Sequence, residues 1–138
     1  MITLMSVHTV TSGREEDYVA IQQRLWELTW KHEPETIRYE HFRGTKPGQF
    51  ISLLSFRDLD TFLEHQIADY HDDVAWEGLF VEHEMQWLDP MPGAGDLGQT
   101  VLEPLPTDID PVKRSYAEML PAERPAWWGP VVRPDMAK

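Results

Sequence analysis

The residue with the clearest chemical potential in this sequence is a histidine on the apolar face of a predicted helix. Over residues 62–74 the apolar side chains recur at steps of three and four, which is typical of a helix with one buried face. His71 falls on that apolar face, whereas His65 falls on the polar face. A titratable ring among apolar neighbours is costly unless it has a partner, and enzymes use such rings for proton transfer near neutral pH. The same pattern also fits a core histidine whose ring is bonded to a backbone carbonyl, so both interpretations stand.

Two further histidines lie on predicted strands. His8 and His83 each fall at the parity of apolar residues, so both side chains are expected to line the same cavity as His71. Three converging imidazoles would suit a zinc, iron or copper ion, but no two histidines have the i, i+4 spacing of a helical metal site. We therefore expect no metal. The alternatives are acid–base catalysis at His71, His65 and His83, or structural hydrogen bonding between the strands.

Aromatic and apolar side chains provide the walls of a predicted pocket. Most of them belong first to the core, but several can also bound an aromatic ligand, since small-molecule pockets are mostly apolar with few polar groups. A phenol on the predicted edge strand adds a group that can bind a substrate oxygen. The predicted substrate-binding residues are His8, Tyr39, Trp26, Trp30, Phe62, Met85 and Trp87.

The sequence contains no convincing cofactor motif. Residues 93–98 have the letters of the dinucleotide-binding fingerprint, but Pro104 and Pro106 follow where that fingerprint requires a helix. Cysteine is absent, which excludes thiolate metal sites, iron–sulfur clusters and a cysteine nucleophile. We therefore expect an activity that needs no cofactor.

Length and charge limit the kinds of partner that this chain can have. Its 138 residues suffice for one domain with a substantial core, and its formal net charge is −12 at pH 7. Only 12 residues are Lys or Arg, so neither a nucleic acid nor an anionic membrane surface is an expected partner. No apolar run approaches the roughly 18 residues of a membrane span, and no charged leader precedes the first strand. The expected location is the cytoplasm.

The predicted elements follow the order βαββαβ. The predicted strands and helices cover residues 2–10, 14–32, 36–43, 49–56, 58–78 and 79–88. This is the ferredoxin-like arrangement of an α+β fold, with two helices on one face of a four-stranded antiparallel sheet. The other face carries apolar side chains that need cover, which a second copy of the chain would supply in a homodimer.

Residues 89–138 form a proline-rich C-terminal extension. Nine of the eleven prolines lie in it, together with Trp127 and Trp128, whose large side chains favour burial. An aspartate followed by a proline favours a short helix over residues 112–120. We expect an α+β domain over residues 1–88 and an arm that docks on this domain, or on a dimer partner, through its tryptophan pair.

The first 88 residues resemble the dimeric α+β barrel superfamily, and within it the antibiotic biosynthesis monooxygenase group. In that group the second helix commonly ends in a short motif that carries a histidine. The matching stretch here is Ile67-Ala68-Asp69-Tyr70-His71, without the proline of the group. In a polyketide cyclase branch the residue at the position of His71 is the base, and a tyrosine six residues earlier assists it; this chain has His65 there. Residues six apart on a straight helix point about 120° away from each other, so the two rings meet only if the helix bends or ends near Asp69.

The resemblance implies a small enzyme that acts without a cofactor on a phenolic, quinol or polyketide-like aromatic substrate. The leading activity is that of a monooxygenase with His71 as general base. The same base and pocket would also suit a cyclase, isomerase or lyase. A non-catalytic ligand-binding or stress-associated barrel is a third interpretation, in which His71 is structural and tolerates replacement by Gln.

Overall fold

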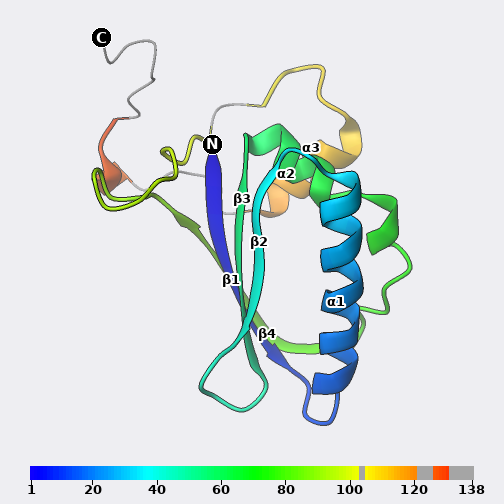
Figure 1. Cartoon of the computed structure of the whole chain (residues 1–138). Coiled ribbons are helices and arrows are strands. Elements are labelled where there is room, and N and C mark those ends of the chain that lie inside the picture. Colours follow the sequence, from blue (N-terminus) through cyan, green and yellow to red (C-terminus); the bar gives the residue numbers. More distant parts are fainter. Residues whose placement is uncertain (103–104, 121–125, 131–138) are drawn as a thin grey trace.

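The first strand of the chain lies in the middle of a four-stranded sheet (Figure 1). The computed structural model describes residues 1–102, 105–120 and 126–130. Its four strands and first two α-helices are β1 (Ile2–Val10), α1 (Glu15–His32), β2 (Thr36–Arg43), β3 (Gln49–Phe56), α2 (Leu59–Gln66) and β4 (Phe80–Leu88). The strand order is β2-β3-β1-β4 and every neighbouring pair is antiparallel. The predicted ferredoxin-like α+β fold is therefore confirmed.

Alternate residues of the central strand face the helices and form the core. Leu4 lies opposite Leu54 of β3 and Trp87 of β4, and all three side chains are buried. Farther along the same face of β1, His8 lies opposite His83. Side chains alternate between the two faces of a strand, so Leu4 and His8 point to the same face. That face of the sheet carries core residues near Leu4 and histidines near His8.

Helix α1 packs on the sheet through a narrow stripe of side chains. Tyr18, Leu25 and Thr29 are buried on this stripe. The prediction that Trp26 and Trp30 belong first to the core is wrong, because their side chains are 46% and 41% exposed. Helix α1 contacts β2, which is the edge strand of the sheet. The side of the helix that carries Trp26 and Trp30 therefore lies past this edge, where no further strand of the described residues covers it.

The second helix is much shorter than predicted. Its first turn is capped by Asp58, whose carboxylate accepts the Thr61 N–H at 2.8 Å. Two residues after α2 ends, Ala68 takes an extended backbone (φ −60°, ψ 135°), and a single 3₁₀ turn, η1 (Asp69–His71), follows. The prediction of one helix over residues 58–78 is wrong, because this extended residue interrupts the regular hydrogen bonding that side-chain spacing alone implies.

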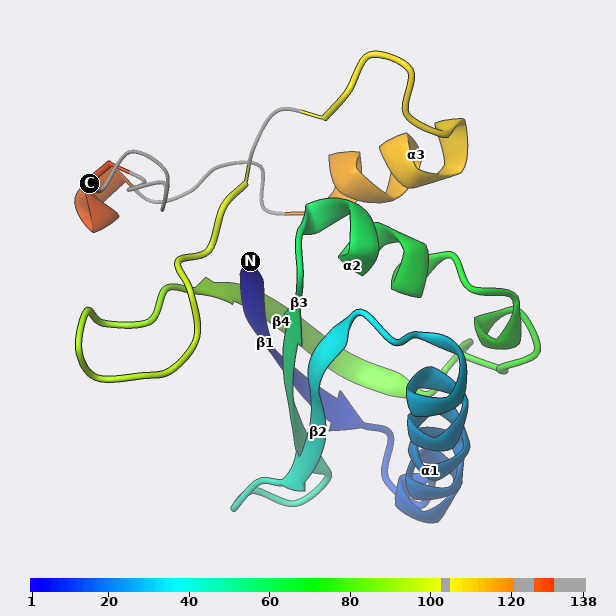
Figure 2. The ribbon, with the colours of Figure 1, turned by 45° about the horizontal axis from the view of Figure 1, so that its top comes forward.

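The extension runs beside the end of the sheet and then against α2. Thr100 is fully buried: its side-chain oxygen accepts the Thr3 N–H at 3.2 Å and donates to the last carbonyl of β4. Farther on, α3 (Pro111–Met119) lies against α2 (Figure 2). Trp128, in the short turn η2 (Ala126–Trp128), packs against the core, but Trp127 is 85% exposed, so the predicted burial is wrong for Trp127.

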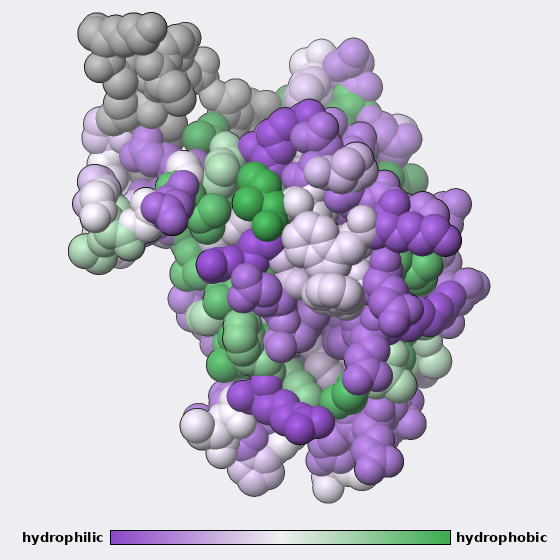
Figure 3. Space-filling model, in the orientation of Figure 1, coloured by the Kyte–Doolittle hydropathy of each residue, from purple (hydrophilic) through white to green (hydrophobic). Residues whose placement is uncertain are grey.

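The face of the sheet opposite the helices carries apolar side chains. Phe42, Ile51 and Val7 lie side by side across β2, β3 and β1. Leu53 and Met5 are paired two residues farther along β3 and β1, on the same face. Phe42 is exposed and the other four are half-buried. Figure 3 shows hydrophobic side chains gathered over the strands beside α1. Within the part of the chain that the structure describes, no helix is long and apolar enough to span a membrane.

Candidate active site

A cavity of about 400 Å³ lies between the sheet and the helices. All four strands contribute to its walls, together with α1, α2, η1 and α3. Five of the six histidines of the chain line it: His8, His41, His65, His71 and His83. Such a concentration of imidazoles around one apolar space marks the cavity as the candidate site.

Seven of the ten predicted site residues meet at this cavity. They are His71, His65, His83, His8, Tyr39, Phe62 and Met85. The remaining three are tryptophans that lie elsewhere. Trp87 is buried in the core with its ring 5.9 Å from that of Phe62. Trp26 lines a separate groove between α1 and β2, and its ring lies 6.1 Å from that of Trp30.

A carboxylate holds one of the histidines. His65 is only 3% exposed, so its predicted place on a polar helix face is wrong. Its Nδ1 lies 3.0 and 2.9 Å from the two carboxylate oxygens of Glu33. Because an ionised carboxylate only accepts hydrogen bonds, Nδ1 of His65 donates in this contact, and Nε2 is the ring nitrogen that Glu33 does not engage.

Glu33 is a residue of the candidate site that sequence reasoning missed. It follows the last residue of α1, and its backbone N–H donates to the Thr29 carbonyl at 2.8 Å. Nothing in the sequence connects residue 33 with residue 65, which is 32 positions away. The only signal is an acidic residue at the end of a predicted helix, directly before Pro34.

His71 lies beside His65 because the second helix ends early. The two rings are 4.9 Å apart and nearly perpendicular, at 81°. Burial, together with His65, lowers the pKa of His71 to about 4, against the opposing effects of Glu33 and the backbone of Ala68. The Trp76 indole N–H donates to the His71 carbonyl at 3.3 Å, which fixes the turn that carries this ring. At pH 7 the imidazole of His71 is therefore neutral.

The strand histidines form a second group in the same cavity. The ring of His8 stacks on that of His83 at 4.7 Å, with the planes 7° apart. Burial, and secondarily His83, lower the pKa of His8 to about 4. The Nδ1 atom of His8 is buried and makes no hydrogen bond with any described residue. His83 is exposed at the cavity's edge.

Tyr39 and His41 connect the edge strand to the site. The Tyr39 ring lies 5.0 Å from the His65 ring, and burial raises the pKa of this phenol. His41 shares a 2.8 Å hydrogen bond between its Nδ1 and the Ser52 hydroxyl, and burial lowers the pKa of its ring to about 4. Both groups therefore stay uncharged at neutral pH and can only exchange hydrogen bonds with a ligand.

The described residues contain no cluster of three or more histidine, cysteine or acidic side chains that could hold a metal ion. The cavity instead offers neutral imidazoles, the two phenols of Tyr39 and Tyr116, and one carboxylate-bound imidazole. Such a set can bind an aromatic molecule and move a proton.

Solved structures of other proteins have the same architecture. One titled an antibiotic biosynthesis monooxygenase superposes with a TM-score of 0.60 at 16% identity and covers 67% of this chain and 100% of its own. A Caulobacter crescentus protein, provisionally given that name, has a TM-score of 0.60 at 17% identity, covering 65% and 89%. A Mycobacterium tuberculosis protein, Rv0793, has a TM-score of 0.59 at 12% identity, covering 68% and 98%. No family model matches the sequence, and neither does any curated protein.

The chain has the fold of the antibiotic biosynthesis monooxygenase structures.

The length of these monooxygenase-like structures corresponds to the sheet with its two helices. Residues 1–88 are 88 of 138 residues, or about 64% of the chain, and the matched structures cover 63–68% of it. They are themselves covered almost completely, at 87–100%. About a third of this chain therefore lies outside the part that it shares with each of them.

Proposed function

We propose that this protein is a small enzyme that removes a proton from a phenolic, quinol or polyketide-like aromatic substrate without a cofactor. The observation that carries the proposal is His65 in the wall of an apolar cavity, hydrogen-bonded to Glu33 behind it, with the His71 ring 4.9 Å away. A carboxylate that keeps one imidazole nitrogen protonated leaves the other free to accept a proton and stabilises the charge that results. The names of the structural neighbours support an oxygen-dependent reaction.

In this proposal His65 accepts the proton and His71 positions the substrate. The sequence favoured His71 as the base, but a pKa of about 4 makes its imidazole a weak base at pH 7. His65 has the Glu33 carboxylate to offset the positive charge of its protonated ring. A neutral His71 can still exchange a hydrogen bond with the substrate hydroxyl and orient it toward His65.

The leading reaction is a monooxygenation in which the substrate supplies the electrons. Proton removal gives an electron-rich anion, which passes one electron from its carbanion form to dioxygen. The two radicals combine at carbon, and the imidazolium returns its proton to give a hydroperoxide. Loss of water converts an activated CH₂ carbon into a carbonyl, so one oxygen atom stays on the product and the other leaves as water.

The size and lining of the cavity favour an uncharged aromatic substrate. Its volume of about 400 Å³ lies within the range of small-molecule sites. Leu54, Phe62 and Met85 supply apolar walls, and the Tyr39 phenol, whose pKa burial raises, keeps its proton for donation to a substrate oxygen. A charged ligand would lose its hydration in this cavity, which is costly without an opposite charge nearby. The carboxylate that lies beside the site is that of Glu33, and it would repel an anion.

A cyclase, isomerase or lyase is the second candidate, because the base and the pocket contain nothing that is specific for oxygen. Removal of the same proton would then begin a carbon–carbon bond rearrangement in place of electron transfer. A non-catalytic ligand-binding barrel is the third candidate, and it requires no proton acceptor. In that case the Glu33–His65 pair serves only to satisfy two buried polar groups.

The test is turnover of a panel of hydroquinones and polyketide-type phenols, followed by product analysis with and without oxygen. A monooxygenase consumes one dioxygen per product and stops under nitrogen, whereas a cyclase, isomerase or lyase continues. His65→Gln should abolish either activity, since an amide cannot accept the proton. A binding barrel would turn over none of the panel, and its ligand affinity would survive His65→Gln.

The helix-free face of the sheet supports a homodimer as the functional form. Phe42, Ile51, Val7, Leu53 and Met5 present apolar surface there, and burial of such surface is the main driving force of association. Light scattering at micromolar concentration should give twice the mass of one chain, and Phe42→Glu should give a monomer. A single-chain mass for the unaltered protein would remove the dimer from the proposal.

A further inference from the structure

The C-terminal extension contributes side chains to the wall of the cavity. Tyr116 and Met119 of α3, with the following Leu120, line the space that holds the histidines. We infer that α3 is a built-in wall of the ligand site and sets the size of the aromatic molecule that the site accepts. This inference rests on the proposed function for the aromatic nature of the ligand, but not for the reaction.

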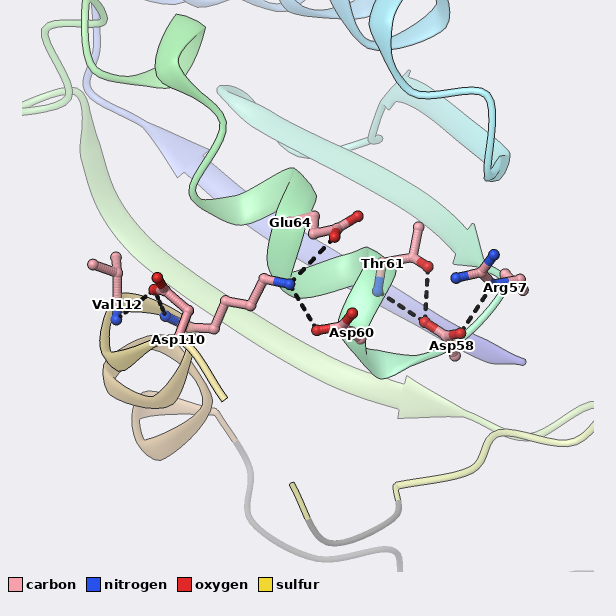
Figure 4. Close-up of polar contacts among 8 residues, drawn as sticks. Arg57, Asp58, Asp60, Thr61, Glu64, Asp110 and Val112 are labelled. Carbon is pink, nitrogen blue, oxygen red and sulfur yellow. Dashed lines mark hydrogen bonds and ion pairs between the residues drawn. The ribbon is translucent and has the colours of Figure 1, made fainter. Parts of the chain in front are cut away.

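Two charged contacts fix α3 on α2. The Lys113 amine lies 2.7 Å from the Asp60 carboxylate and 3.3 Å from that of Glu64, both on α2 (Figure 4). The Lys113 side chain is only 13% exposed, so these contacts are less screened than those of a fully exposed ion pair. At the start of α3, the Asp110 carboxylate accepts the Val112 N–H at 2.8 Å and caps the helix.

Apolar packing fixes α3 from the other side. Ile109, Tyr116, Ala117 and Leu120 pack against the buried core of the sheet. Helix α2 carries His65. The charged and apolar contacts that hold α3 therefore also set the distance between α3 and His65. A ligand with its hydroxyl at His65 therefore has a limited length before its far edge meets the wall.

The three lining side chains differ in what they can tolerate. Tyr116 and Leu120 are half-buried and bound the interior, whereas Met119 is 71% exposed and lies at the mouth. A methionine side chain adapts readily to different shapes, so the mouth admits variation that the interior does not. The ligand is therefore a flat hydroxylated arene whose far end is selected by Tyr116 and Leu120.

The experiment compares the affinities of two fluorescent probes, the two-ring 2-naphthol and the three-ring 2-hydroxyanthracene, in the full-length protein. Leu120→Trp reduces the space and should weaken the three-ring probe by about 10-fold more than the two-ring probe, the scale on which pockets discriminate by size. Tyr116→Ala enlarges the space and should shift the ratio the opposite way. Val112→Trp is the matched control, because Val112 is on the same helix, exposed and outside the cavity lining.

An unchanged affinity ratio in both Leu120→Trp and Tyr116→Ala overturns the wall, and so does an equal shift in Val112→Trp. If one variant fails to fold, the ratio in the other decides. Failure of the unaltered protein to bind either probe refutes the aromatic site and the wall with it. Because the readout is binding, a shifted ratio supports the wall even if His65→Gln keeps full turnover, which would refute the proposed base alone.

Discussion

Two pairs of histidines face the same cavity, and they differ in one neighbour. The His65 and His71 rings are 4.9 Å apart, and the His8 and His83 rings are 4.7 Å apart. Only the first pair has a carboxylate, Glu33, hydrogen-bonded to one ring; in the described part of the chain no ion pair reaches the second. Ring type and proximity are alike in the two pairs, so the proposed assignment of His65 as the proton acceptor rests on the adjacent charge.

The largest expected effect separates the two pairs directly. We expect His65→Gln to lower turnover by about 100-fold or more, the usual scale for loss of a general base. His8→Gln is the matched control, because it also replaces a cavity imidazole but one without a carboxylate, and it should keep turnover within about 3-fold. Steady-state kinetics on the substrate found in the panel provides the comparison. Equal losses in both variants would mean that the carboxylate is irrelevant to the distinction.

Replacement of the carboxylate should give the next largest effect. We expect Glu33→Gln to lower turnover by roughly 10-fold or more, because the amide no longer stabilises a positive charge on His65. Glu33 also raises the pKa of His71, so the variant should move the titration of His71 below about 4. NMR titration of the imidazole resonances measures this change. If neither turnover nor the His71 titration moves, Glu33 has no electrostatic role in the site.

Acid should weaken the fold through the histidines that lack a carboxylate partner. His8, His41 and His71 have pKa values of about 4 in the folded protein and an ordinary value of 6.5 when unfolded. Above pH 6.5 these rings are neutral in both states. Between pH 6.5 and 4 only the unfolded chain takes up their protons, so stability falls as the pH falls through this window.

Urea unfolding at a series of pH values measures this loss. The carboxylates of this acidic chain also titrate, so the informative quantity is the difference between the protein and His41→Asn, which removes one of the three rings. The variant should show a shallower fall between pH 6.5 and 4 and an unchanged slope above pH 7. Identical slopes in the two proteins would show that the folded His41 titrates normally.

The smallest expected effect on turnover is that of replacing His83, the exposed member of the His8–His83 pair. His83 is exposed and its main described contact is the stack on His8. We expect His83→Ala to change turnover by less than about 3-fold, since no proton acceptor is lost. Because His83 lowers the pKa of His8, the variant should raise the pKa of His8 slightly, which NMR can detect. A large loss of turnover would move the catalytic role to the strand histidines.

The sequence predicted the sheet well because each strand can be recognised from the residues within it and in the turns beside it. Alternating side chains marked the first and fourth strands, and the glycines and proline of residues 44–48 marked the hairpin between β2 and β3. The second helix was harder, because the three- and four-residue spacing continues past Ala68, where the backbone turns extended. Spacing reports which residues prefer burial and does not report where the hydrogen bonding stops.

The site was only partly predictable because two features of the second helix were missed. His65 lies within the regular part of α2 and is buried beside Glu33, and the break at Ala68 brings the ring of His71 next to it. Glu33 was out of reach for another reason, because its contact with residue 65 exists only after α1 and α2 have packed on the sheet. The cavity's histidines were therefore largely foreseen, and the charge that distinguishes one of them was not.

The central place of β1 has a consequence for how the newly made chain behaves on the ribosome. The strand partners of Leu4 are Leu54 in β3 and Trp87 in β4, both far along the chain. Strand β1 is therefore synthesised before both of its neighbours, and one of its two edges stays unpaired until β4 has been made. At translation speeds of about 5–20 residues per second, the roughly 80 intervening residues take about 4–16 s. During that interval an apolar, strand-forming segment offers an unpaired edge to other nascent chains. Synthesis of residues 80–88 ends this exposure, so a pause in translation shortly before them would raise the aggregation of this protein more than a pause after them.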